Sequence, residues 1–237
     1  MATFVQTNVG LYWGGYSLAS SFNAIALSLG NAPQDNTVYG DTFMSNASGL
    51  SSVTLEGEGY WESATDAALE ASLSVDDTVL TVTPVDQAAG SRAFFSKVTA
   101  SQYNPLATGT VGSMMGFSLS AEGRGEKNVG GEILVIPATY SSSSESSTNA
   151  SIGAVSATQS VYSALHVTAA SGTLDVVVES APSNWSGEST RITHTQFTGI
   201  GAEMKSTAGA ITDAYWRVKW TISGGGSFNF ICSLGIT

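Results

Sequence analysis

The chain has 237 residues, of which 42% are hydrophobic and only 11% are charged, and its formal net charge is −11. The hydrophobic fraction is large enough to form a core, which excludes wholesale disorder, and the excess of acid excludes binding to nucleic acid through a basic surface. With so few charges, Ser, Thr, Asn and Gly must cover much of the surface. Such a surface suits a protein whose exterior is buried against neighbours, and it suits a secreted β protein equally well.

The negative charge is concentrated in the first part of the chain. Residues 1–140 contain 13 acidic and 4 basic side chains, a balance of −9, whereas residues 141–237 contain 6 and 4, a balance of −2. Arg92 is the first Lys or Arg in the chain. A surface built from the residues before Arg92 should therefore repel nucleic acid.

The chain contains a single cysteine, Cys232, within the apolar run FNFICSLGI. One cysteine excludes an intramolecular disulfide and a cysteine-based zinc site, so we expect Cys232 to be a small buried hydrophobe. The start, MATFVQTNVGLYWGG, lacks the basic and apolar regions of a signal peptide, and no run approaches 18 apolar residues. We therefore expect neither a signal peptide nor a membrane-spanning helix.

Taken in chain order, most of the sequence alternates apolar and polar residues between turn residues, a pattern typical of short antiparallel strands. The predicted fold class is mostly β, with sandwich or barrel architecture. Strands are expected within residues 51–61, 77–85, 93–103, 115–123, 131–140, 162–169, 172–180, 190–197, 215–223 and 227–236.

The segment ESATDAALEASL, residues 62–73, is the exception to this pattern. It is rich in good helix formers, Asp66 would lie in the first turn, and Ser63 or Thr65 can cap the first turn. The sequence predicts one short helix here, flanking the strands.

The segment YSSSSESSTNAS, residues 140–151, is a serine-rich stretch that cannot pack a core. It falls where the charge balance changes. We therefore predict two domains, residues 1–140 and 152–237, joined by a linker at 141–151; a long loop within one continuous sandwich is the alternative.

Residues 152–237 are predicted to form a C-terminal β-sandwich, because apolar residues alternate along each of its strands. Its predicted core consists of Leu165, Val167, Val176, Val178, Ile192, Trp216, Val218, Trp220, Phe228 and Phe230.

Carboxylates are the first candidates for chemistry. Glu56 and Glu58 lie two apart on a predicted strand and so face the same way, about 7 Å apart, which does not exclude a glycosidase pair. The flanking glycines favour an acidic strand face instead. The run DNTVYGD, residues 35–41, lacks the ligand spacing of a calcium loop.

The remaining motifs also favour structural roles. His166 and His194 lie within strand patterns without metal-type spacing, and no nucleophile motif or set of triad residues is evident. Trp216 and Trp220 share one face of a strand, with Arg217 and Lys219 on the other. This face is either core or a platform that stacks sugars or bases. We expect no cofactor and no metal.

Residues 1–140 resemble the tail tube (major tail) proteins of long-tailed bacteriophages. The resemblance lies in LYWGGYSLASSFNAIALS, in DNTVYGDTFMSNASGLSSVTLEGEGYWES, in the short helix, and in AFFSKVTASQYNPLATGTVGSMMGFSLSAEG. The residues at the family's motif positions are Asp35, Thr37, Tyr39, Gly40, Asp41, Thr42, Gly49, Leu50, Gly57 and Tyr60. Residues 152–237 look like the β-sandwich appended in some of these proteins.

This resemblance implies a tail-tube-like β-barrel or sandwich that assembles into rings, usually hexamers, which stack into a tube. It implies a structural, non-enzymatic virion protein, assembled in the host cytoplasm, that contacts tape measure, terminator and distal tail proteins. The acidic lumen of such a tube lets double-stranded DNA pass during genome ejection without sticking to the wall. No membrane partner is implied.

The resemblance also implies roles for particular residues. The candidates for lining the lumen are Glu56, Glu58, Glu62, Asp35 and Asp41, and the candidates for contacts between rings or subunits are Tyr39, Asp41, Phe43 and Met44. Two alternatives stay open: a capsid decoration or other virion surface protein, and a carbohydrate-binding module that uses Trp216 and Trp220.

Overall fold

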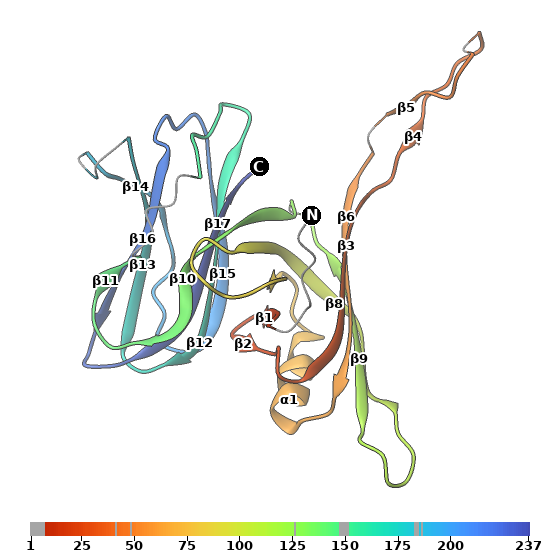
Figure 1. Cartoon of the computed structure of the whole chain (residues 1–237), viewed down its shortest axis with the longest axis horizontal. Helices are drawn as coiled ribbons and strands as arrows, with labels where there is room; N and C mark the ends of the chain where they lie inside the picture. Colours follow the sequence, from red (N-terminus) through yellow and green to blue (C-terminus); the bar gives the residue numbers. More distant parts are fainter. Residues whose placement is uncertain are drawn as a thin grey trace. The chain divides into compact units, whose positions relative to one another are not determined.

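The computed structural model describes residues 8–40, 42–47, 49–125, 127–146, 152–182, 185 and 187–237 (Figure 1). Strands make up most of these residues, and their described pairings are antiparallel. The prediction of a mostly β, sandwich-like fold is confirmed.

The predicted helix is α1, Ser63–Ser72, the only α-helix among the described residues. Its N-cap is Glu62, whose side chain makes no capping hydrogen bond, so the expectation that Ser63 or Thr65 caps the helix is wrong. The hydroxyl of Thr65 is used elsewhere: it is buried and lies 2.7 Å from Ser21 Oγ.

The chain divides into two compact units (Figure 1). Unit 1 comprises residues 1–20, 78–97 and 129–237, and unit 2 comprises residues 21–77 and 98–128. The strands of unit 1 are β1 (Gly10–Trp13), β2 (Tyr16–Ser17), β7 (Thr78–Thr83), the start of β8 (Arg92–Thr108), β10 (Val129–Tyr140), β11 (Ser144–Glu145), β12 (Ser160–Ala170), β13 (Thr173–Ala181), β14 (Ser189–Thr193), β15 (Gly201–Ala208), β16 (Tyr215–Ser223) and β17 (Phe228–Ile236). Unit 2 holds α1, the rest of β8, β3 (Phe22–Asn31), β4 (Gln34–Asp35), β5 (Asn46–Ala47), β6 (Ser51–Tyr60) and β9 (Gly116–Gly123).

The main core of unit 1 lies between the sheet β11-β16-β13-β14 and the strands β12, β17 and β10. Inward residues of both layers interdigitate there, as in β-sandwiches generally. All ten core residues predicted from the sequence belong to this cluster, so that prediction is confirmed. Leu134 and Val135 of β10 belong to it as well.

Strands β12 and β17 are covered on both faces. On the side away from the main core, Ala164 packs in a cluster with Val79 and Phe95, and Ile231 packs in another with Tyr12. In strands with two covered faces, nearly every residue is buried, and burial no longer alternates along the strand. Both strands show such a run in their middle.

The compact units do not follow the division expected from the sequence. Strand β10 precedes the serine-rich stretch, yet it pairs with β17 and supplies part of the main core, and β1 and β7 supply the second set of clusters. The serine-rich stretch therefore falls within unit 1. Its residues 147–151 lie outside the described part of the chain.

The sheet of unit 2 has the order β3-β6-β9-β8. Strand β6 alternates strictly: Val53, Leu55, Gly57 and Gly59 are buried and the residues between them are exposed. The glycines make room for aromatic rings, because a Cβ on Gly57 would overlap the Phe22 ring and one on Gly59 would approach Phe117. The sequence EGEG thus combines an acidic face with a tightly packed one.

Candidate assembly surface

One face of the unit 2 sheet is polar, small and uncovered within the unit. Residues directly opposite each other on neighbouring strands point to the same side. The register therefore groups Ala24, Ala26 and Ser28 of β3, Thr54, Glu56 and Glu58 of β6, Ser118, Ser120 and Glu122 of β9, and Thr99, Gln102 and Asn104 of β8. We call this set the acidic face.

The acidic face carries three carboxylates and no basic side chain. Glu122 joins the two glutamates predicted from the sequence, because it lies opposite Thr54 on the neighbouring strand. Unit 2 as a whole contains eleven Asp and Glu against two basic residues, a formal charge of −9 out of the −11 of the chain. The carboxylates of this face would repel a phosphate backbone.

Glu56 and Glu58 do not form a built acid–base pair. Both are exposed, and neither makes a hydrogen bond or ion pair with any described residue.

Glu62 lies away from the acidic face. It follows the end of β6 as the N-cap of α1, where Ser21 Oγ donates to it at 3.2 Å. Helix α1 lies on the packed side of the sheet. Tyr103 is paired with the buried Leu119 and so points to that side, and its hydroxyl donates a hydrogen bond to Asp66 of α1 at 2.6 Å. The structure therefore separates Glu62 from Glu56 and Glu58, with which the sequence grouped it.

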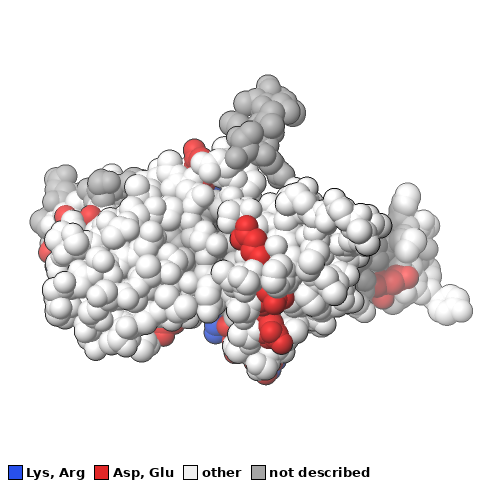
Figure 2. Space-filling model, turned by 90° about the horizontal axis from the view of Figure 1, so that it is seen from below, with Lys and Arg blue, Asp and Glu red and all other residues white. Residues whose placement is uncertain are grey.

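Helix α1 carries an acidic stripe of its own. Glu62, Asp66 and Glu70 follow at intervals of four residues, so they share one side of the helix. Figure 2 shows a row of acidic side chains on the face seen from below, where α1 lies in Figure 1. This stripe supplies negative charge to the packed side of the sheet.

A long arm, residues 32–50, extends β3 and β6 beyond the sheet (Figure 1). Its short strands β4 and β5 pair, and Asn36 N donates to Ser45 O. Tyr39 is fully exposed, and Phe43 and Met44 are 85% and 75% exposed. An apolar group of this size is unusual on a free monomer and typical of an interaction surface. Asp41 lies outside the described residues.

Asp35 belongs to the turn of the long arm and not to the acidic face. Its Oδ1 accepts hydrogen bonds from the hydroxyl and the backbone N of Thr37, and these two bonds lower the pKa of the carboxyl. A side chain that bonds the backbone two residues on stabilises a turn. The structure therefore gives Asp35 a conformational role.

A short arm, residues 105–115, joins β8 to β9 at the other end of the same sheet (Figure 1). Asn31 lies opposite Ser51 at the end of the long arm, and Tyr60 lies opposite Gly116 at the end of the short arm. The exposed apolar side chains of the short arm are Leu106, Val111, Met114 and Met115. This arm was not predicted from the sequence, although it lies between two predicted strands.

The unit 2 sheet has two open edges. Among the described residues β3 pairs only with β6, and residues 102–108 of β8 pair only with β9. Strand β3 has ten residues without a charge or a proline. Exposed edges are usually blunted by charge, proline or short length, so this edge is suited to pairing with another strand.

Three residues of unit 1 have the connectivity of a hydrolase triad. Ser163 Oγ lies 3.0 Å from His194 Nε2, and His194 Nδ1 lies 3.0 Å from Glu203 Oε2. This grouping was not predicted from the sequence. Ser163 is fully buried, however, and its Oγ also contacts Cys232 Sγ at 3.3 Å. No substrate reaches a hydroxyl so enclosed, and the network satisfies buried polar groups between strands.

The other sequence candidates are buried. Trp216 and Trp220 belong to the main core, and their indole N–H groups donate to Gly153 O and Ser142 O. They form no exposed stacking platform, because both rings fill the space between two sheets. His166 is enclosed between Thr81 and Gly14. The described residues contain no cluster of His, Cys, Asp and Glu able to hold a metal ion.

No helix in the described part of the chain has the length and apolar character to cross a membrane.

Comparison with known proteins gives distant likenesses. No model of a protein family matches the chain, and no curated protein sequence matches it. A chain in the virion of a native gene transfer agent particle is 13% identical, with a TM-score of 0.39 over 47% of this chain and 85% of that one. The Dit (gp 19.1) protein of SPP1 is 8% identical, with a TM-score of 0.37 over 98% and 100%. A chain of the phage p2 baseplate is 8% identical, with a TM-score of 0.39 over 96% and 98%.

Proposed function

We propose that the protein is a structural virion subunit that forms rings, and that the rings stack into the tail tube of a long-tailed phage. The observation that carries the proposal is the unit 2 sheet, which combines an acidic face with two open edges. A ring closed through those edges turns one sheet face inward on every subunit. The protein acts by assembly and needs no catalytic group.

The strand directions are compatible with ring closure. The strands β3, β6, β9 and β8 alternate in direction, so the β8 edge of one copy and the β3 edge of the next copy run antiparallel. An even number of strands in each copy lets this alternation continue around a ring of any size. Pairing would satisfy the open backbone groups of both edges, which is the usual route of strand addition.

The acidic face is the surface that we assign to the lumen. The other side of the sheet is covered by α1, so the uncovered side is free to line a channel. Basic groups would bind the passing genome by counterion release, whereas Glu56, Glu58 and Glu122 repel it. Small Ala, Ser and Thr side chains around them leave the wall smooth. Of the lumen candidates from the sequence, we assign Glu56 and Glu58 to this surface and add Glu122, whereas Asp41 lies outside the described residues.

The two arms are the surfaces that we assign to stacking. They lie at opposite ends of the sheet and both carry exposed apolar side chains, so the long arm of one ring can cover the short arm of the next. A head-to-tail contact between two different surfaces repeats without limit and produces a tube. Tyr39, Phe43 and Met44 would be buried in that contact.

Electron microscopy of the purified protein tests the proposal. The expected result is rings that stack into tubes with an open channel. Hydrogen exchange adds a direct test of the edges, since the amide protons of β3 should exchange slowly in rings and rapidly in the monomer. A protein that stays monomeric under all conditions, or rings in which β3 exchanges freely, would contradict the proposal. Isolated rings that never stack would support ring formation and contradict the proposed tube.

A further inference from the structure

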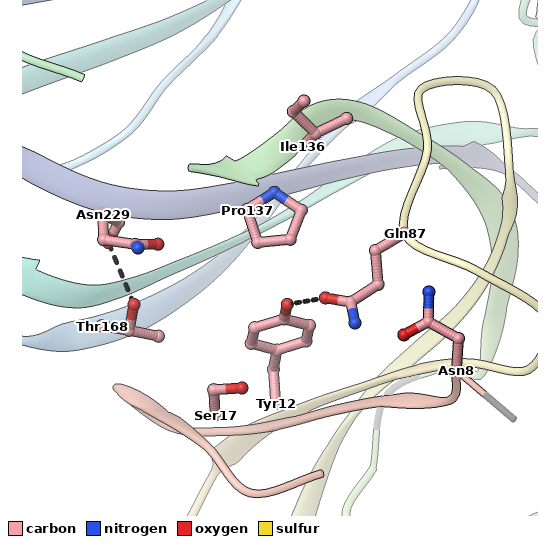
Figure 3. Close-up of a pocket in the computed structure, with 8 residues that line it drawn as sticks. All are labelled: Asn8, Tyr12, Ser17, Gln87, Ile136, Pro137, Thr168 and Asn229. Carbon is pink, nitrogen blue, oxygen red and sulfur yellow. Dashed lines mark hydrogen bonds between the residues drawn. The ribbon is translucent and has the colours of Figure 1, made fainter. Parts of the chain in front are cut away.

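The described residues that line a pocket in unit 1 include no charged side chain. Its volume is about 470 Å³, within the range of small-molecule sites, roughly 300–1,000 Å³. Figure 3 shows the side chains that line it, which come from β1, β2, β10, β12, β17 and the segments beside β1 and β7. They are Asn8, Tyr12, Ser17, Gln87, Ile136, Pro137, Thr168 and Asn229.

Two strand irregularities occur at this pocket. In β10 the pairing with β17 shifts between Val135 and Ala138, which sets Ile136 and Pro137 out of register. In β12 the pairing with the same strand shifts between Val167 and Ala169, at Thr168. Bulges redirect side chains and are common beside functional sites. Here both bulges supply residues that line one cavity.

The pocket contains hydrogen-bonding groups that have no partner among the described residues. The side-chain amides of Asn8 and Asn229 bond to no described residue. Gln87 accepts a hydrogen bond from the Tyr12 hydroxyl through its oxygen, and its NH₂ group remains available (Figure 3). Each amide can donate and accept, so the pocket presents several groups of both kinds.

These features select a class of ligand. A charged ligand would lose its hydration without meeting an opposite charge. An apolar ligand would leave the amides unpartnered, which is costly for buried polar groups. A neutral molecule with several hydroxyl groups satisfies both conditions, and its C–H surface can pack against Ile136 and Pro137. The geometry points to a saccharide-binding site in unit 1, separate from the assembly surface.

Binding of neutral sugars to the intact protein tests this inference. Glucose, galactose, N-acetylglucosamine and lactose serve as probes in saturation-transfer NMR and calorimetry. At least one of them is expected to bind saturably. Asn229→Ala should weaken binding about tenfold, the effect of one or two lost hydrogen bonds. This change keeps the bond from Thr168 to the backbone oxygen of Asn229. Gln87→Ala provides an independent second variant outside the strands.

Gln196→Ala is the matched control, because Gln196 is an exposed amide of unit 1 that lines no part of the pocket. It should leave sugar affinity unchanged. The inference is wrong if none of the four sugars binds, if Asn229→Ala and Gln87→Ala both bind as the wild type does, or if a neutral capped Ser-Gly-Ser peptide binds while the sugars do not. Ring formation is measured separately by microscopy, so failure here leaves the proposed assembly untouched.

Discussion

At the scale of single residues, the most constrained polar group is His166 of unit 1. Its Nδ1 donates to Gly14 O at 2.6 Å, and its Nε2 accepts from the Thr81 hydroxyl at 2.7 Å. Burial lowers the pKa of His166 to about 4, against a usual value of 6.5, and the bond to Gly14 O opposes this shift. The imidazole is therefore neutral in the folded protein at neutral pH.

His166 makes stability depend on pH. Its folded pKa lies below the unfolded one, so between pH 6.5 and 4 the unfolded chain binds a proton that the folded protein does not, and stability falls as the pH is lowered through this window. The expected loss between pH 7.5 and 5.5 is about 1 kcal/mol, measured from urea unfolding. His166→Gln, which keeps a donor and an acceptor, should remove this part of the slope. An equal slope in both proteins would contradict the assignment.

The glutamates of the acidic face give a second prediction at this scale. Glu56→Lys with Glu58→Lys reverses the charge of two exposed residues that bond no described neighbour, so folding and tube assembly should persist. A basic lumen would hold DNA phosphates, so ejection should be slowed or trapped, and more so at low salt. Glu70→Lys on α1, an exposed residue outside the acidic face, is the control and is expected to leave ejection unchanged. Normal ejection from well-formed tubes of the first variant would exclude a lumenal position.

At the scale of elements, the long arm is the part of unit 2 that contributes least to its own unit. Its described residues are almost all exposed, and β4 and β5 pair only with each other. An exposed apolar element that adds so little to the stability of its own unit is typical of a surface that binds a partner.

Deleting residues 36–48 tests the arm. The sheet and its packed face remain intact, so the variant should be a folded, soluble protein with an unchanged unfolding midpoint. It should fail to form tubes, as judged by sedimentation and microscopy. Tubes of normal length from this variant would show that the arm is not needed for stacking.

Strand β10 gives a second prediction about elements. It supplies Leu134 and Val135 to the main core and pairs with β17 along most of its length. The fragment 152–237, proposed from the sequence as an autonomous domain, lacks this strand. A fragment of residues 128–237 should therefore unfold cooperatively at a clearly higher denaturant midpoint than 152–237. Equal midpoints would mean that β10 adds nothing to the fold of the sandwich.

At the scale of the whole molecule, the negative charge and the apolar arms both belong to unit 2, whereas unit 1 is nearly neutral at −2. Assembly and repulsion of DNA are thus functions that we propose for one unit. The neutral pocket is a function that we propose for the other.

Cross-linking between copies tests how the molecules stack. Phe43→Cys combined with Val111→Cys should give an intermolecular disulfide on oxidation, if the long arm of one copy covers the short arm of the next. The native Cys232 will not interfere, because it is buried and burial raises its thiol pKa to about 12. Phe43→Cys with Val75→Cys is the control, since Val75 is exposed on unit 2 outside both arms. Equal cross-linking of the two pairs would argue against this contact.

The sequence by itself determined the local features of the protein. Alternation of apolar residues is a property of neighbouring positions, and it sufficed to predict ten strand segments, the core of the sandwich and the shared face of Glu56 and Glu58. It did not single out β1, β3 or β15, which the structure adds. Only the tertiary structure decided which strands lie together. The register added Glu122 to the acidic face, the start of α1 removed Glu62 from it, and pairing of β10 with β17 moved the unit boundary. These outcomes depend on contacts between residues far apart in the chain, and alternation within one strand carries no information about its partner.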